Sequence, residues 1–279
     1  MRIVLTGAHG QLGTDLQRLL ASHHLTLLDL PQFDLTRSDC GRAIVDATPD
    51  VVIHAGAYTD VDGAERNPDL ARAVNAHGTE RVARAAAQAG ARLIYISTDY
   101  VFDGHASRPY LETDPPNPIN AYGVSKRAGE EQALACCSKT LVIRTAWLYG
   151  RHGKNFVKTI LQLAADQPVL RVVGDQRGCP TFAEDLADVI AQVMGRSVQG
   201  ILHVTNAGAC TWHEFASEIV ALSGRAVRVD PITTAEAGRL ARRPAYSVLA
   251  AERLRQLGIV MPSWQDALKR FLQPVSAGV

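Results

Sequence analysis

Short apolar runs alternate with helical patterns through the first half of the chain. The near-continuously apolar runs, which are typical of strands buried on both faces of a parallel sheet, lie at residues 2–6, 25–29, 50–54, 91–97 and 140–144. Helix-forming stretches separate them, including residues 11–21 and the Ala- and Arg-rich residues 69–88, which Gly90 ends. This alternation predicts an α/β fold with a Rossmann-type doubly wound parallel sheet.

The pattern loosens after residue 150. It predicts one strand at 170–173 and helices at 155–165, at about 182–194 and at 211–223. Thr211 and Glu214 have the spacing of a capping box, and prolines spread through the tail from Arg225 predict a path over the surface rather than further strands of the sheet. We therefore expect a dinucleotide-binding domain over residues 1–150. A smaller lobe over 151–279 would mainly bind substrate and would send segments back to the first domain.

Composition excludes several classes of protein. The 279 residues are 47% hydrophobic and 20% charged, which suits a chain with a full core. The 29 Lys and Arg residues against 28 Asp and Glu leave a net charge of +1, so a nucleic-acid partner is not expected. Five cysteines without chelating spacing, and the lack of a leader-like or membrane-spanning apolar segment, favour a reduced cytoplasmic setting and no membrane partner.

A glycine-rich run follows the first predicted strand and opens a helix; it reads Thr6-Gly7-Ala8-His9-Gly10-Gln11-Leu12-Gly13. Glycines there allow a tight turn and a close approach of backbone N–H groups to a pyrophosphate. A turn with helix-packing glycines would account for this run alone, but not for Asp29 at the end of the next strand, where a carboxylate accepts the adenosine ribose hydroxyls. The pattern therefore predicts dinucleotide binding. Because Asp29 repels a 2′-phosphate and no Lys or Arg follows before Arg37, NADH is favoured over NADPH.

Tyr122 and Lys126 have the i, i+4 spacing that places both side chains on one face of a helix. A phenol relays protons poorly at neutral pH until a nearby ammonium stabilises its phenolate, and Lys126 could supply that charge. The same spacing is common on surface helices. Thr98, at the end of the fourth predicted strand, could orient a reacting carbonyl or could simply cap the following turn. Together with the dinucleotide pattern, these residues favour a catalytic trio.

These motifs resemble the extended short-chain dehydrogenases/reductases. Longer strings narrow the resemblance to the dTDP-4-dehydrorhamnose reductase family within that group, and they span residues 2 to about 270. The strings lie at residues 10–13 (Gly-Gln-Leu-Gly), 57–65, 97–104 (Ser-Thr-Asp-Tyr-Val-Phe-Asp-Gly), 144–150 (Arg-Thr-Ala-Trp-Leu-Tyr-Gly), 155–158, 175–181 and 243–247. Long strings in this order are specific to that family.

The resemblance implies reduction of the C4 ketone of dTDP-4-dehydro-β-L-rhamnose to dTDP-L-rhamnose, with NADH or NADPH as cofactor and a nucleotide sugar as substrate. By position, Tyr122 would donate the proton, Lys126 would lower its pKa and hold the nicotinamide ribose, and Thr98 would orient the carbonyl. The expected cofactor contacts, besides Tyr122, Lys126 and the motif residues Gly7 and Gly13, are Gly10, Gln11, Leu12, Asp29, Asp34, Leu35, Ala57, Tyr58 and Thr59. On the sugar side the family positions are Asp99 and Trp147, and the further candidates are Asn155, Gln176 and Arg243.

Some points stay open at this stage. Magnesium binds some relatives at a subunit contact, and here Asp15, Glu184 and Asp185 could supply acids. Solvated helix charges are the commoner explanation of such acids, so no metal site is assigned, and a homodimer stays an option. Trp212 and Trp264 are interpreted as core residues, and Cys179 is interpreted as an unreactive packing residue.

Two alternative functions are also open. The first is a nucleotide-sugar epimerase or dehydratase, although a dehydratase would show a second acid after Asp99, where this chain has Tyr100. The second is a non-catalytic regulatory subunit of methionine adenosyltransferase, which the intact catalytic trio disfavours.

Overall fold

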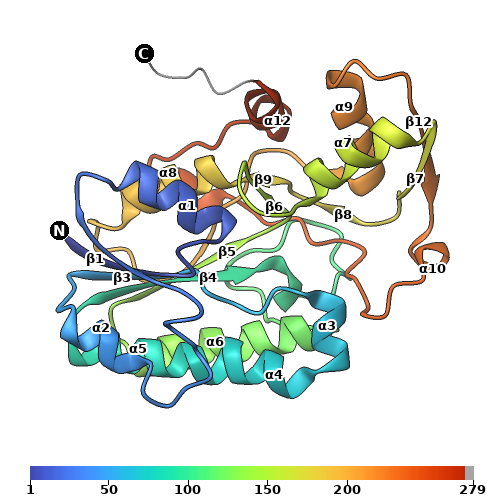
Figure 1. Cartoon of the computed structure of the whole chain (residues 1–279). Coiled ribbons are helices and arrows are strands. Elements are labelled where there is room, and N and C mark those ends of the chain that lie inside the picture. Colours follow the sequence, from blue (N-terminus) through green and yellow to red (C-terminus); the bar gives the residue numbers. More distant parts are fainter. Residues whose placement is uncertain (274–279) are drawn as a thin grey trace.

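Six parallel strands form the central sheet of the computed structural model, which describes residues 1–273 (Figure 1). Their spatial order is β10–β5–β4–β3–β1–β2, and their bounds are β1 (Arg2–Thr6), β2 (His24–Leu28), β3 (Val51–His54), β4 (Arg92–Thr98), β5 (Thr140–Thr145) and β10 (Gly200–His203). The doubly wound parallel sheet and its five N-terminal strands are confirmed. The order reverses at β1, whose neighbours are β2 and β3, and the crevice at such a reversal is where this kind of fold binds ligands.

Helices cover both faces of this sheet. One face carries α2 (Gly41–Asp46), α3 (Val61–Arg66), α4 (Pro68–Arg72), α5 (Thr79–Gln88) and α6 (Ala121–Cys136), and the other carries α1 (Gln11–Leu19) and α8 (Ala183–Val193), with α11 (Glu252–Gln256) beside β10 (Figure 1). Each face has its own apolar core, around Leu16 and Ile190 on the α1 side and around Val82 and Val142 on the other. No helix within residues 1–273 is both long and apolar enough to cross a membrane.

The single helix expected at 69–88 is interrupted. A π-helical turn (Ala73–Gly78) separates α4 from α5. Asn75, buried in this turn, exchanges hydrogen bonds with the backbone of Tyr58 and donates another to the hydroxyl of Ser125. Propensity alone favours a continuous helix here, but these tertiary bonds fix Asn75 beside α6 and the loop after β3.

The C-terminal lobe has a separate core, rich in aromatic residues, beyond the carboxyl ends of the sheet's strands. Its helices are α7 (Phe156–Asp166), α9 (Trp212–Leu222), α10 (Thr234–Ala237) and α12 (Trp264–Leu272), and its paired strands are β6 (Leu148–Tyr149) with β9 (Thr181–Phe182), β7 (Val169–Val173) with β12 (Arg228–Ile232) and β8 (Arg177–Gly178) with β11 (Cys210–Thr211). The predicted helices, the strand β7 and the capping box at Thr211 are confirmed. The strand β12 was not expected, although it pairs with β7 and not with the central sheet.

The two halves of the chain share the central sheet. The strand β10 pairs with β5, and α8 packs on α1, so these are the segments that return from the C-terminal half. The hydrophobic pattern did not predict the strand β10, because this strand is only four residues long and begins at Gly200, which has a φ of +80°. The expected boundary at residue 150 therefore separates the expected cofactor-binding and substrate-binding parts of the chain. It is not a boundary of the hydrophobic core, because α8 and β10 pack within the first domain.

Candidate active site

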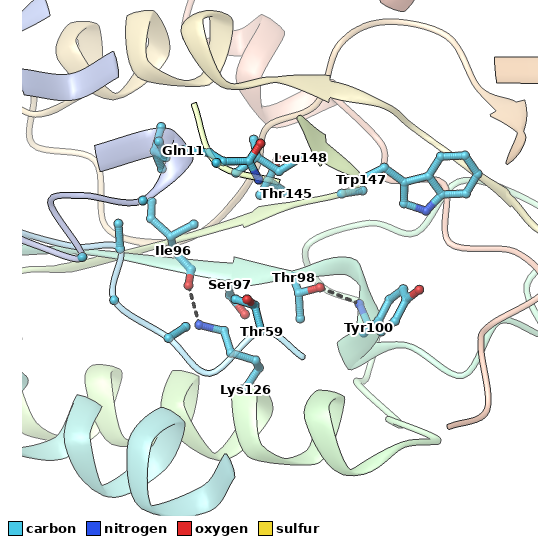
Figure 2. Close-up of a pocket in the computed structure, with 18 of the residues that line it drawn as sticks. Gln11, Thr59, Ile96, Ser97, Thr98, Tyr100, Lys126, Thr145, Trp147 and Leu148 are labelled. Atoms are coloured by element: carbon cyan, nitrogen blue, oxygen red, sulfur yellow. Dashed lines mark hydrogen bonds between the residues drawn. The ribbon is translucent and has the colours of Figure 1, made fainter. Parts of the chain in front are cut away.

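A cavity of about 780 Å³ opens at the carboxyl ends of β1, β3, β4 and β5 (Figure 2). Its lining joins the glycine-rich loop and Asp29 on one side to Thr98, Tyr122 and Lys126 on the other. The lobe closes it with residues from the start of α7 and α9. The sequence-predicted catalytic trio and the predicted dinucleotide loop therefore face one space.

The glycine-rich loop leaves no room for side chains. Gly7 has a φ of +68°, and a Cβ there would lie 2.5 Å from the amide nitrogen of Gly56. A Cβ on Gly13 would lie 2.2 Å from the carbonyl oxygen of Gly7. Gly10 is the N-cap residue of α1, so no N-cap side chain bonds to the first N–H groups of that helix. Such a helix end suits a pyrophosphate.

Asp29 has a local structural role that the spacing did not reveal. Its Oδ2 accepts a 2.7 Å hydrogen bond from the backbone N–H of His9, and its Oδ1 accepts one of 2.8 Å from Leu30. The carboxylate thus pins the glycine-rich loop and still lines the cavity. This position is compatible with the expected contact to ribose hydroxyls.

The other predicted cofactor residues divide into two groups. Gly10, Gln11, Leu12, Ala57 and Thr59 line the cavity. Asp34, Leu35 and Tyr58 are not among its lining residues. Asp34 accepts hydrogen bonds from the N–H and hydroxyl of Thr36, Leu35 is buried, and the backbone of Tyr58 is bonded to Asn75. Roles of these last three in cofactor binding remain predictions.

The helix α6 carries Tyr122 and Lys126 on its first turns. Its N-cap, Asn120, accepts a 2.7 Å hydrogen bond from Gly123, and a Cβ on Gly123 would lie 2.1 Å from the carbonyl oxygen of Tyr100. The start of α6 is therefore pressed against the turn that follows β4. Lys126 Nζ donates a 2.6 Å hydrogen bond to the carbonyl oxygen of Ile96, as Figure 2 shows.

Burial dominates the acid–base properties of this pair. Desolvation lowers the pKa of Lys126 to about 7, against the opposing charge of Glu130. Desolvation also raises the pKa of Tyr122 above its usual range, while a hydrogen bond with Thr98 lowers it. In this arrangement the ammonium of Lys126 is bonded to Ile96, and the expected lowering of the Tyr122 pKa by Lys126 stays a prediction. A phenol of high pKa can still protonate an alkoxide, which is the stronger base.

A fully buried ion pair stands behind Lys126. Glu130, one helical turn further along α6, accepts hydrogen bonds of 2.8 and 2.7 Å from Nε and an Nη of Arg144 on β5 and one of 2.6 Å from Ser97 on β4. Both charged side chains are 0% exposed. The carboxylate therefore joins the catalytic helix to the two strands that end at the cavity. Sequence reasoning missed it, although an arginine within an apolar strand was an available signal.

Two buried polar atoms of residues that line the cavity have no hydrogen-bond partner among residues 1–273. They are Oδ2 of Asp99 and Oγ1 of Thr145, and both residues line the cavity. Burial raises the pKa of Asp99 to about 7. Thr98, which pairs in register with Thr145, donates a 3.1 Å hydrogen bond to Asp99 and accepts one of 3.2 Å from the N–H of Tyr100 (Figure 2). Thr98 thus does cap the turn after β4, and it also lies at the cavity. Thr145 was not among the predicted site residues.

Trp147 lies at the cavity in an unusual backbone conformation. Its φ is +47°, in the left-handed region that bulky residues rarely adopt. Its indole stacks on that of Trp212, with 3.5 Å between ring centroids and 8° between planes. The interpretation of Trp212 as a core residue is wrong, because this side chain is half-buried and lines the cavity. Trp264 is a core residue, as predicted.

Comparisons with known proteins agree with this geometry. The model of the RmlD substrate binding domain matches residues 1–277. The chain is 41% identical to a dTDP-4-dehydrorhamnose reductase from Burkholderia thailandensis over 96% of this chain and 97% of that one. The chain belongs to the dTDP-4-dehydrorhamnose reductase family. A crystal structure of a Bacillus anthracis family member in complex with NADP superposes with a TM-score of 0.94, at 42% identity, over 97% of this chain and 98% of that one.

Relatives of equal similarity carry other names. A probable dTDP-4,6-dihydroxy-2-methyloxan-3-one 4-ketoreductase from Streptomyces antibioticus is also 41% identical, over 99% of this chain and 96% of that one. Overall identity therefore places the chain in the family but does not select one sugar.

The three further substrate candidates lie outside the cavity lining. Asn155 caps α7 and donates a 3.0 Å hydrogen bond to the side chain of Gln11, Gln176 bonds to Thr234, and Arg243 bonds to Asp62. These contacts hold the lobe against the sheet domain and within itself. Direct substrate contacts of Asn155, Gln176 and Arg243 remain predictions for this family member.

The acids considered for magnesium are engaged in other contacts. Both oxygens of Asp185 accept hydrogen bonds from Arg270, at 2.9 and 2.8 Å, and Glu184 pairs with Arg151 at 3.2 Å. Burial raises the pKa of Asp15. Within residues 1–273, no three potential metal-ligating side chains of the His, Cys, Asp or Glu type come together. Cys179 is buried, and burial raises its pKa to about 11, which suits the predicted packing role.

Proposed function

We propose that the protein is an NAD(P)H-dependent reductase that converts the C4 ketone of dTDP-4-dehydro-β-L-rhamnose into the alcohol of dTDP-L-rhamnose. The observation that carries the proposal is the single cavity in which the uncapped start of α1 meets Thr98, Tyr122 and Lys126. Full-length similarity to the reductase family supports the sugar nucleotide as substrate. No feature of the site favours the epimerase, dehydratase or regulatory-subunit alternatives over this function.

The residues present fit a nicotinamide dinucleotide. The glycine-rich loop and the start of α1 would hold its pyrophosphate, and Asp29 would accept hydrogen bonds from its adenosine ribose. When bound, the reduced cofactor supplies the hydride that reaches C4 of the sugar.

The protein's own groups act on the sugar oxygen. Thr98 would orient the carbonyl through its hydroxyl, and Oη of Tyr122 would donate a proton to the oxygen at C4 as negative charge develops there. Lys126 would bind the nicotinamide ribose and, as a buried ammonium, favour the phenolate that remains. Asp99, whose buried Oδ2 has no hydrogen-bond partner within residues 1–273, would bind a sugar hydroxyl.

Cofactor preference and assembly are finer parts of the proposal. Asp29 repels a 2′-phosphate, so we expect a lower KM for NADH than for NADPH, although a relative was crystallised with NADP. A cytoplasmic location and a homodimer remain predictions, and light scattering of the purified chain tests the second.

One assay tests the function as a whole. The chain is mixed with enzymatically prepared dTDP-4-dehydro-β-L-rhamnose and either NADH or NADPH, loss of the reduced-nicotinamide absorbance is followed, and the product is identified by NMR. We expect oxidation of the cofactor and formation of dTDP-L-rhamnose. Absence of oxidation with both cofactors would overturn the proposal.

A further inference from the structure

The lobe side of the cavity is aromatic, and no role has yet been given to most of it. Phe156 at the start of α7, Trp212 at the start of α9 and Trp147 after β5 all line the cavity. The indole of Trp212 contacts both other rings: it stacks on Trp147 with 3.5 Å between centroids, and its centroid is 4.5 Å from that of Phe156, which is tilted by 52°. We call these three residues the aromatic wall.

Trp212 is fixed firmly at its backbone. It is the first residue of α9, directly after the N-cap Thr211, and the reciprocal capping box between Thr211 and Glu214 holds this turn. The helix itself packs into the lobe core through Phe215 and Ile219. The position of the Trp212 ring therefore follows the position of the whole lobe.

Trp147 needs support from outside its own segment. A left-handed backbone costs a bulky residue on the order of 1–3 kcal/mol unless its surroundings hold it in place. Gly178 faces the indole so closely that a Cβ there would lie 2.6 Å from the ring, and Trp212 covers one face of it. The two contacts together leave Trp147 one orientation at the cavity.

We propose that Trp212 is a substrate-binding and specificity-determining residue, whose ring completes an aromatic wall for the apolar face of the sugar. The placement favours the sugar over the nucleotide base, because Trp147 follows Thr145 by two residues and Thr145 pairs in register with Thr98, the expected ligand of the reacting carbonyl. A 6-deoxy-sugar offers C–H groups and a methyl group, and aromatic faces bind such surfaces well. This inference rests on the proposed function.

The stack itself can be tested in solution without substrate. The chain has three tryptophans, and two indoles stacked this closely couple their electronic transitions, which gives paired positive and negative bands in far-ultraviolet circular dichroism. We expect these bands in the wild-type protein and in Trp264→Phe, and their loss in Trp212→Phe. Bands that survive in Trp212→Phe would show that the two rings are not stacked, and the inference would fall.

Binding and kinetics test the role. Trp212→Ala should raise KM for the dTDP-4-dehydro-sugar and weaken dTDP-L-rhamnose binding by about tenfold, with Trp212→Phe between this variant and wild type and with the affinity for NADH unchanged. Calorimetry with dTDP alone should show less than about a twofold change by the same reasoning. An equal loss with dTDP, or an unchanged KM in an active Trp212→Ala variant, would overturn the inference. A wild-type protein that oxidises neither cofactor would instead refute the proposed function.

Discussion

Apart from the aromatic wall, the cavity has two walls that are built on opposite principles. The wall around the glycine-rich loop is made mainly of backbone and small residues, and the carboxylate of Asp29 there is already bonded to the N–H groups of His9 and Leu30. The wall formed by β4, β5 and α6 carries buried ionisable side chains, and where it lines the cavity, Oδ2 of Asp99 and Oγ1 of Thr145 lack partners within residues 1–273. We call them the binding wall and the reacting wall.

The difference indicates how the two tasks are separated. A dianionic pyrophosphate can be bound by N–H groups and a helix end, without a buried charge that would itself need a partner. Proton transfer needs groups whose charge can change, and burial shifts the pKa of Lys126 and Asp99 to about 7. Substitutions on the binding wall should therefore alter cofactor affinity, and those on the reacting wall should alter turnover or its pH dependence.

The largest effect is expected for Tyr122→Phe. Loss of the proton donor should lower kcat by roughly 10²–10⁴. Cofactor affinity, measured by titration of the protein fluorescence, should stay close to wild type because the binding wall is untouched. Near-normal turnover would show that Tyr122 is not the proton donor and would contradict the assignment of proton transfer to the reacting wall.

Glu130→Gln should cause the next largest effect, on folding. It leaves the fully buried Arg144 without its counter-charge, and breaking a buried pair in this way costs about 3–5 kcal/mol of unfolding free energy. The matched control is Glu131→Gln on the same helix, since Glu131 is 57% exposed and its ion-pair partner, Arg127, is 30% exposed. Urea denaturation should separate the two variants clearly. Equal, small losses would mean that the ion pair does not hold the reacting wall together.

Lys126→Met should change stability in a pH-dependent way. The pKa of Lys126 is lowered from 10.5 to about 7 in the folded protein. Below about pH 7 the buried side chain is charged, and this lowers the free energy of unfolding by its full amount. The loss becomes smaller as the pH rises from about 7 toward 10.5. Neighbouring His54 is buried with its pKa lowered to about 3 and stays neutral in this window. Melting temperatures should show the variant stabilised most at pH 6, with the gain shrinking toward pH 10. A gain independent of pH would contradict the shifted pKa.

Gly7→Ala should change the binding wall, and its effect should be smaller than those of the three variants above. The left-handed backbone at Gly7 costs an alanine about 1–2 kcal/mol, and the clash of its Cβ with Gly56 adds to this. Gly90→Ala is the control, because Gly90 has a φ of +69° but no atom within 4 Å of an added Cβ. Calorimetric titration should show weaker NADH binding for Gly7→Ala alone. Equal NADH affinities in the two variants would show that the close approach at Gly7 is irrelevant to the cofactor.

Sequence predicts the parts of the site that are local in the chain. The glycine-rich run, the i, i+4 pair on α6 and the apolar strands depend on spacing over a few residues, which the backbone periods fix. The pair of Glu130 and Arg144 and the stack of Trp147 on Trp212 form only when distant segments pack together. The charged residue inside the apolar run at 140–144 was a clue to a buried partner, but nothing in the sequence named that partner. The π-helical turn at Ala73–Gly78 likewise depends on contacts of Asn75 with other segments.

The position of β10 has a consequence for how such enzymes change over evolution. The strand β10 pairs with β5 and forms one edge of the central sheet. Arg92 and Arg253 hold this segment by donating hydrogen bonds to the carbonyl groups of Val198 and Ile201, respectively. The edge strand therefore comes from a part of the chain that follows the first elements of the lobe. In a fragment ending at residue 150, the apolar strand β5 would be an exposed edge strand, and its unpaired N–H and C=O groups could pair with other chains. The lobe therefore cannot be exchanged as a cassette at one junction. A graft of new sugar specificity must replace lobe segments on both sides of β10, including α9 with Trp212, and must leave β10 paired with β5.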